Sequence, residues 1–174
     1  VGSNAEVNAS GGDIVAWCWE AGGAPTADNS AGAGATPTSN SVKIDGSNLG
    51  SALAGTIPAT RLSANTSKGF SIVSYTGTGS NATVAHGLGA VPNWILIKNR
   101  SSARVWLVYH SANTANPETE YLVLDDTAGT ADDNSAFNDT APTSTVFSVG
   151  TSWSSNKSGE NLIAYCWTGI TGYS

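Results

Sequence analysis

Seven short apolar runs, each bounded by residues that favour turns, constrain the fold of this chain more than any other feature. The runs are rich in β-branched and aromatic residues, as strands are. No ten-residue window shows the 3.6-residue periodicity of an amphipathic helix. The runs are residues 70–75, 82–86, 94–98, 105–110, 121–124, 145–149 and 162–167. They predict an all-β fold, an antiparallel β-sandwich of the jelly-roll-like kind, with its longest loop from Asp125 to Pro142.

An internal repeat links the two ends of the chain. The opening segment VGSNAEVNASGGDIVAWCW (1–19) aligns without a gap with VGTSWSSNKSGENLIAYCW (149–167), at a constant offset of 148 residues. The agreement covers both a Gly-containing turn and the strand-like run behind it, which chance similarity between two aromatic strands does not explain. We therefore interpret residues 1–24 as the terminal strand of a preceding repeat module.

The repeat predicts three parts in the chain. Residues 1–24 are the terminal strand of a preceding module, residues 25–68 are an extended connector rich in Gly, Ala, Pro and Thr, and residues 69–174 are the β-sandwich module. Apolar residues of the first two parts have no local partners, so we predict that they pack against a module or against copies of this chain. They are Val15, Trp17, Trp19, Leu49, Leu53, Ile57 and Leu62. The opening strand either packs within the chain or completes a partner's sheet.

Charge and hydropathy exclude two classes of partner. Charged residues make up only 11% of the chain, the formal net charge is −6, and the seven Lys and Arg residues are scattered. Such a chain lacks the basic patch that binds phosphate backbones, so we predict no nucleic-acid partner. The longest apolar runs fall far short of the ~20 residues of a membrane-spanning helix, so we predict no membrane insertion.

Nearly the whole sequence resembles a β-rich module of tail-fibre and tail-associated proteins of marine tailed bacteriophages. The resemblance rests on the following stretches: GFSIVSYTGTGSNATVAHGLGAVPNWILIKNR (69–100), VYH (108–110), FNDTAPTSTVFSVGT (137–151), SGENLIAYCWTGITGYS (158–174), VNASGGDIVAWCWEAGGAPT (7–26) and IDGSNLGSALAGTIPATRLSANT (44–66). It implies a fibre building block or host-recognition module, located in the tail fibre of the virion and therefore extracellular. It also implies adjacent tail proteins and host surface glycans as partners, and it supplies no catalytic residues.

The two cysteines are equivalent in the repeat and need not approach within bridging distance, so we predict buried free thiols at Cys18 and Cys166. We expect no cofactor except, as an alternative, a Ca²⁺ ion. Calcium takes six to eight oxygen ligands, and the densest group of carboxylates lies in the longest loop. The candidate ligands are Asp125, Asp126, Asp132 and Asp133, and the competing interpretation is a solvated acidic loop.

Aromatic residues raise the question of sugar binding, because sugar rings stack on exposed aromatic faces. Trp94 and Trp106 lie at or within predicted strands, so we expect both in the core. Trp153 lies in a polar stretch, and we therefore predict it as the ligand-facing aromatic, with Asn156 beside it.

Nucleophilic catalysis has little support. The residue types of a Ser-His-Asp triad are present at His110, Ser111 and Asp125, but the chain contains no Gly-x-Ser-x-Gly elbow. His86 is expected to bond to the backbone of a turn.

Three functions remain open. The first is a non-enzymatic structural module of a tail fibre, self-associated as a homotrimer or fibre and contributing to host recognition. The second is a monomeric carbohydrate-binding module of an extracellular bacterial protein that binds glycans through Trp153. The third is a polysaccharide depolymerase that depends on a carboxylate such as Asp125 or Glu120.

Overall fold

The computed structural model describes residues 4–172 and has an all-β fold. The sequence prediction of the fold class is therefore confirmed, and each of the seven apolar runs overlaps a strand. The strands are β1 (Val42–Ile44), β2 (Ser47–Asn48), β3 (Ala59–Asn65), β4 (Phe70–Thr76), β5 (Ala82–Ala85), β6 (Trp94–Asn99), β7 (Leu107–His110), β8 (Glu120–Val123), β9 (Ala131–Asp132), β10 (Val146–Val149) and β11 (Asn161–Trp167). The helices are single turns: α1 (Ala5–Asn8), η1 (Pro117–Thr119), α2 (Asn134–Phe137) and α3 (Trp153–Asn156).

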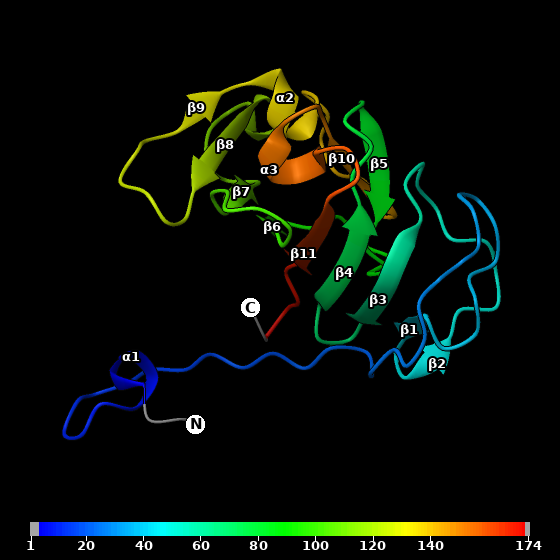
Figure 1. Cartoon of the computed structure of the whole chain (residues 1–174), viewed down its shortest axis with the longest axis horizontal. Helices are drawn as coiled ribbons and strands as arrows, with labels where there is room; N and C mark the ends of the chain where they lie inside the picture. The colour runs from blue at the N-terminus through cyan, green and yellow to red at the C-terminus, as the bar shows by residue number, and fades with distance from the viewer. Residues whose placement is uncertain (1–3, 173–174) are drawn as a thin grey trace.

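Nine of these strands form one large sheet, in the order β2-β1-β3-β4-β11-β6-β7-β8-β9 (Figure 1). Neighbours are antiparallel except for β1 and β3, which are parallel. β11 lies at the centre of the sheet, paired with β4 on one side and with β6 on the other. The strand that comes last in the chain therefore joins two halves of the sheet built from earlier strands.

A second, two-stranded sheet of β5 and β10 covers one face of the large sheet. The core lies between the two sheets because alternate residues of each strand point to the same side. Tyr75 and Phe147 face each other across this core with their ring centroids 6.3 Å apart in a T-shaped arrangement. The hydroxyl of Tyr75 donates to the backbone carbonyl of Ser155 at 2.6 Å, which attaches α3 to the large sheet.

The segment predicted as a connector, residues 25–68, is part of the folded domain. The domain boundary predicted at residue 69 is therefore wrong. β3 pairs with β4 and carries Leu62, which is fully buried. Leu53 and Ile57 also lie in the core, and Leu49 packs against it. These four residues therefore pack against the module, as the first of the two predicted alternatives has it, and the prediction that they mediate self-association is wrong for the three buried ones. Because these residues are irregularly spaced, the sequence pattern does not indicate the strand and the loop that pack against the rest of the domain.

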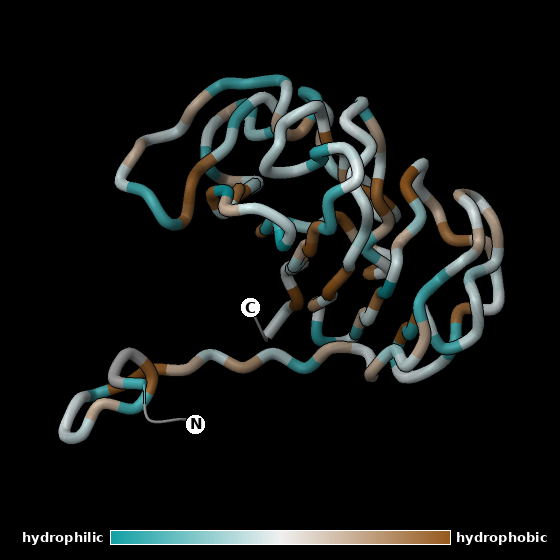
Figure 2. Tube along the Cα trace, in the orientation of Figure 1, coloured by the Kyte–Doolittle hydropathy of each residue, from teal (hydrophilic) through white to brown (hydrophobic). Residues whose placement is uncertain are grey.

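Residues 4–24, which we call the arm, contain no strand. After α1 the arm is extended and leaves the body of the molecule (Figure 1), and Figure 2 shows apolar residues along it. The arm joins the domain at Gly22, whose carbonyl accepts a hydrogen bond from the Gly46 N–H at 2.7 Å. A Cβ at Gly22 would lie 1.7 Å from the Ala64 carbonyl oxygen, so this close approach requires glycine.

Candidate functional site on the open face of the large sheet

The face of the large sheet that β5 and β10 leave uncovered carries a row of aromatic side chains. Trp94 of β6 and Trp167 of β11 are cross-strand partners, and their rings stack with centroids 4.4 Å apart. Tyr165 continues the row at 6.3 Å from Trp167, and Trp106 stacks on Tyr165 at 6.3 Å. We call these four residues the aromatic stripe. Trp94 and Trp106 are only half-buried on this face, so their predicted place in the core is wrong.

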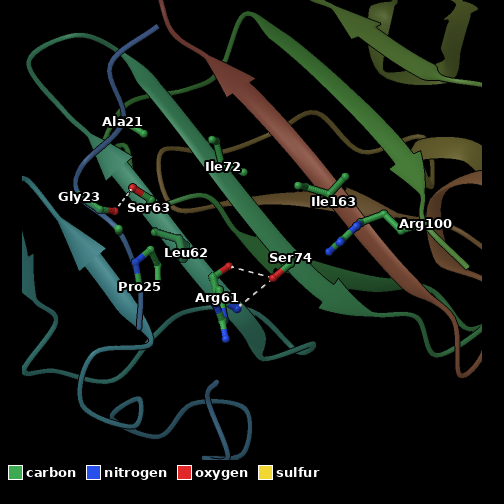
Figure 3. Close-up of a pocket in the computed structure, with 11 residues that line it drawn as sticks. Ala21, Gly23, Pro25, Arg61, Leu62, Ser63, Ile72, Ser74, Arg100 and Ile163 are labelled. Carbon is green, nitrogen blue, oxygen red and sulfur yellow. Dashed lines mark hydrogen bonds between the residues drawn. The ribbon is translucent and has the colours of Figure 1, made fainter. Parts of the chain in front are cut away.

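A groove of about 470 Å³ lies on the same face, over β3, β4 and β11 (Figure 3). Its floor combines the aliphatic side chains of Ile72 and Ile163 with the hydroxyls of Ser63 and Ser74. Residues 21–25 of the chain form one wall. The lining contains no His, Cys, Asp or Glu, so its side chains are suited to binding and not to acid–base chemistry.

Two arginines border the groove. Arg61 forms an ion pair with Asp28, in which Nε and Oδ1 are 2.5 Å apart, and both side chains are about half exposed. Exposed pairs of this kind contribute little stability. The side chain of Arg100 points toward Ser74 (Figure 3), and its guanidinium has no hydrogen bond or ion pair within residues 4–172. An unpaired guanidinium above apolar carbon and hydroxyl groups can bind an anionic group of a hydroxyl-rich ligand.

Trp153 lies outside this groove, at the first position of α3. Its side chain is 57% exposed, as the prediction of an exposed aromatic requires. However, the Arg104 guanidinium carbon and the Lys157 Nζ each lie 4.7 Å from its ring centroid. A sugar would have to displace a cation from the ring in order to stack there.

The predicted ligand contact at Asn156 is wrong, because its side chain is fully buried. Its Oδ1 accepts from the Thr78 N–H at 2.8 Å, and its Nδ2 donates to the carbonyls of Ser80 and Gly150 at 2.7 and 2.8 Å. The side chain therefore joins the turn at residues 78–80 to the backbone at Gly150. The sequence around Asn156 is rich in Ser, and nothing in it predicts that this side chain is buried and bonded to distant backbone groups.

The four predicted calcium ligands serve separate local roles. Asp125 accepts from the Trp106 N–H at 2.9 Å, and Asp126 accepts from the backbone of its own turn. Asp133 caps the N-terminus of α2 by accepting from the Ser135 N–H at 2.8 Å, whereas Asp132 is an exposed residue of β9. Within residues 4–172 no three His, Cys, Asp or Glu side chains gather where they could hold a metal ion.

Burial shifts the pKa of the Cys166 thiol, and hydrogen bonds shift the pKa of the Glu160 carboxyl. Burial raises the pKa of the Cys166 thiol to about 12, as expected for an inert free thiol, whereas Cys18 is exposed in the arm and its predicted burial is wrong. Glu160 accepts hydrogen bonds from Lys157, Ser102 and Asn99, which lower the pKa of its carboxyl to about 2. This carboxylate fixes the turn before β11.

The remaining predicted self-association residues lie in the arm. Val15 and Trp17 are 74% and 77% exposed. Trp19 is 46% exposed and packs against Phe70 and Trp167, with ring centroids 5.9 and 5.3 Å apart. The arm therefore approaches the end of the aromatic stripe. In the described part of the chain, no helix has the length and hydrophobicity needed to cross a bilayer.

Comparison with known proteins gives one match. The model of a family described as a domain of unknown function (DUF7483) matches residues 43–174, from the middle of β1 through β11. The match leaves out the arm. No curated protein and no solved structure matches the chain.

Proposed function

We propose that this chain, which belongs to the DUF7483 family of domains of unknown function, is a non-enzymatic structural module that associates with copies of itself in a phage tail fibre. The observation that carries the proposal is the concentration of exposed apolar side chains in the arm. Of the nine large hydrophobic residues exposed in the described structure, five lie between Val7 and Trp19. Burying such surface gains about 25 cal/mol for each Å², so the arm favours association.

The tail fibre is proposed as the setting because the sequence resembles tail-fibre modules. Such a module works by geometry: rigid β-domains extend the reach of a fibre, and repeated weak contacts gain strength through their high effective concentration. Copies of this chain and adjacent tail proteins are the proposed partners. The proposed location is the outside of the virion.

Self-association is tested by sedimentation equilibrium of the 174-residue chain. We expect a mass near three times 17.6 kDa. The double variant Val15→Ser/Trp17→Ser removes the two most exposed apolar side chains of the arm and is expected to sediment as a monomer. Leu124→Ser is the matched control, because Leu124 is 58% exposed on another part of the surface. A monomeric wild-type chain, or a double variant that retains the wild-type mass, would overturn self-association through the arm.

A second function, recognition of acidic surface glycans, is favoured by the unpaired Arg100 above the groove. A uronic-acid unit offers a carboxylate to the guanidinium and an apolar C–H face to the aliphatic floor. Its hydroxyls can donate to the oxygens of Ser63 and Ser74, whose own hydroxyls donate to the carbonyls of Gly23 and Arg61. In this proposal, glycans bind on the open face of the large sheet and not, as predicted from the sequence, at Trp153. It applies equally to a fibre module and to a monomeric carbohydrate-binding module.

We expect Arg100→Ala to weaken binding of a uronic-acid hexasaccharide about tenfold, because a hydrogen bond to a charged group contributes about 1.5–3 kcal/mol. Calorimetric titration measures the dissociation constant, and Lys43→Ala, a change of charge outside the groove, is the control. Equal affinities of Arg100→Ala and wild type would exclude the groove. Reducing ends are counted in the same samples, and their release would favour a depolymerase.

A further inference from the structure

The arm repeats the local structure that precedes β11, and not only its sequence. At the offset of 148 residues, α1 coincides with α3. The Val7 N–H donates to the Asn4 carbonyl at 3.2 Å, and the equivalent Ser155 N–H donates to Ser152, also at 3.2 Å. Residues 4–12 therefore have the conformation of residues 152–160 without the surroundings that the latter have.

The turns that follow the two helices also agree. Gly11 and Gly159 both have a φ of +74°, a left-handed conformation that favours glycine. The N–H after each glycine closes the turn, from Gly12 to Ala9 at 3.3 Å and from Glu160 to Lys157 at 3.1 Å. In the C-terminal copy, this turn leads directly into β11.

The two copies differ in what covers the strand that follows. In β11, the side chains of Leu162, Ala164 and Cys166 are fully buried between the sheets. In the arm, Ile14 is the equivalent of Leu162 and is 48% exposed, and Cys18, the equivalent of Cys166, is exposed as well. The arm thus carries the core-facing residues of a central strand, but its own chain has no place for them, because β11 already occupies that place.

We infer that residues 4–19 are the helix–turn–strand unit of a second copy of this domain, and that residues 13–19 fill the central position between β4 and β6 of that copy. The sequence offset fixes the register. Cys18 takes the position of Cys166, opposite the residues equivalent to Ser71 and Ile95, and Trp19 takes that of Trp167, opposite those equivalent to Phe70 and Trp94. The partner is a DUF7483 domain that receives its last strand from this arm.

The contacts of Trp19 indicate how two such domains meet. Trp19 would end the central strand of the first domain, and it packs here against Phe70 and Trp167 of the second. The carbonyl of Gly22, three residues later, is bonded to the Gly46 N–H of the second domain. Consecutive domains would therefore be joined through the aromatic ends of their central strands, with little free linker between them.

The inference rests on the proposed function for its setting, a fibre of repeated domains. The domain that it names as receiving the arm lacks its own last strand, because β11 fills the central place in this chain, and the test does not require an oligomer. The full chain is given the strand of its own arm by four substitutions: Asn161→Asp, Leu162→Ile, Ile163→Val and Tyr165→Trp. We expect this chimera to unfold cooperatively, with a melting temperature within about 10 °C of wild type, because core substitutions that conserve volume cost less than about 1.5 kcal/mol.

The control chimera carries the same seven-residue sequence, that of residues 13–19, shifted by one position relative to residues 161–167. A shift of one residue turns every side chain to the opposite face of the sheet, so we expect this control to lose cooperative unfolding. If the first chimera fails to unfold cooperatively, or if both chimeras fold equally well, the inference is overturned. A monomeric wild-type chain would overturn the proposed self-association and leave this test unaffected.

Discussion

Replacing Asn156 by Ala is expected to lower the free energy of unfolding by about 3–5 kcal/mol. The side chain is fully buried and joins two segments of the backbone, the turn that contains Thr78 and Ser80 and the residue Gly150. Alanine leaves the buried Gly150 carbonyl without this partner, which costs about 1–3 kcal/mol, and removes two part-buried hydrogen bonds of about 0.5–1.5 kcal/mol each. Because domains of this size are stable by about 5–15 kcal/mol, the variant would approach the limit of folding.

Urea unfolding followed by tryptophan fluorescence measures this loss. Asn161→Ala is the matched control, since Asn161 is exposed and its side chain has only a 3.4 Å hydrogen bond from Thr76. We expect the control to change the free energy of unfolding by less than about 0.5 kcal/mol. A loss below about 1 kcal/mol for Asn156→Ala would contradict the structural role assigned to this residue.

Acidification from pH 7 to pH 4 is expected to remove about 3 kcal/mol of stability through His86 alone. Burial lowers the pKa of His86 from 6.5 to about 4, against a smaller opposing effect of its hydrogen bond to the Thr143 carbonyl. Nε2 lies 3.1 Å from that carbonyl oxygen and donates to it, while Nδ1 accepts from the Leu88 N–H at 3.2 Å. Protonation of Nδ1 would break the second bond and bury a charge.

The sign follows from the lowered pKa. Below pH 6.5 the unfolded state binds a proton at His86, whereas the folded state does not bind this proton until about pH 4. The free energy of unfolding therefore falls as the pH is lowered across this interval, and the full contribution of neutral His86 to stability is present at pH 7. Urea unfolding at several pH values measures the slope. His86→Gln is expected to be less stable at pH 7 but to lack this part of the slope. A variant with the same slope as wild type between pH 6.5 and pH 4 would refute the assignment.

The strands that were predicted from sequence are those with long β-branched or aromatic runs, such as β4, β6 and β11. β3 was missed because its sequence, ATRLSAN, is largely small or polar and does not alternate. Its burial comes from pairing with β4 and from the loop that carries Ile57, and no local pattern records either contact. The prediction that residues 25–68 form a connector is wrong for the same reason.

The groove could not be predicted, because the order of the strands assembles it. Arg61, Arg100 and Ile163 are far apart in the sequence, and they meet because β11 lies between β4 and β6. The polar neighbours of Trp153 predict that it is exposed, and it is. No local pattern indicates that Arg104 and Lys157 lie against its ring. Local composition thus predicts exposure but not which side chains share a site.

The central place of β11 also determines when the domain can fold during synthesis. In the large sheet, β2-β1-β3-β4 and β6-β7-β8-β9 are connected only through this strand, which the ribosome makes after all the others. Until residues 161–167 have left the exit tunnel, the nascent chain holds two half-sheets with open edges, the state in which β-proteins are most prone to aggregate. A polypeptide with several such domains would close each sheet before the strands of the next domain emerge, so neighbouring domains of similar sequence would have little opportunity to exchange strands.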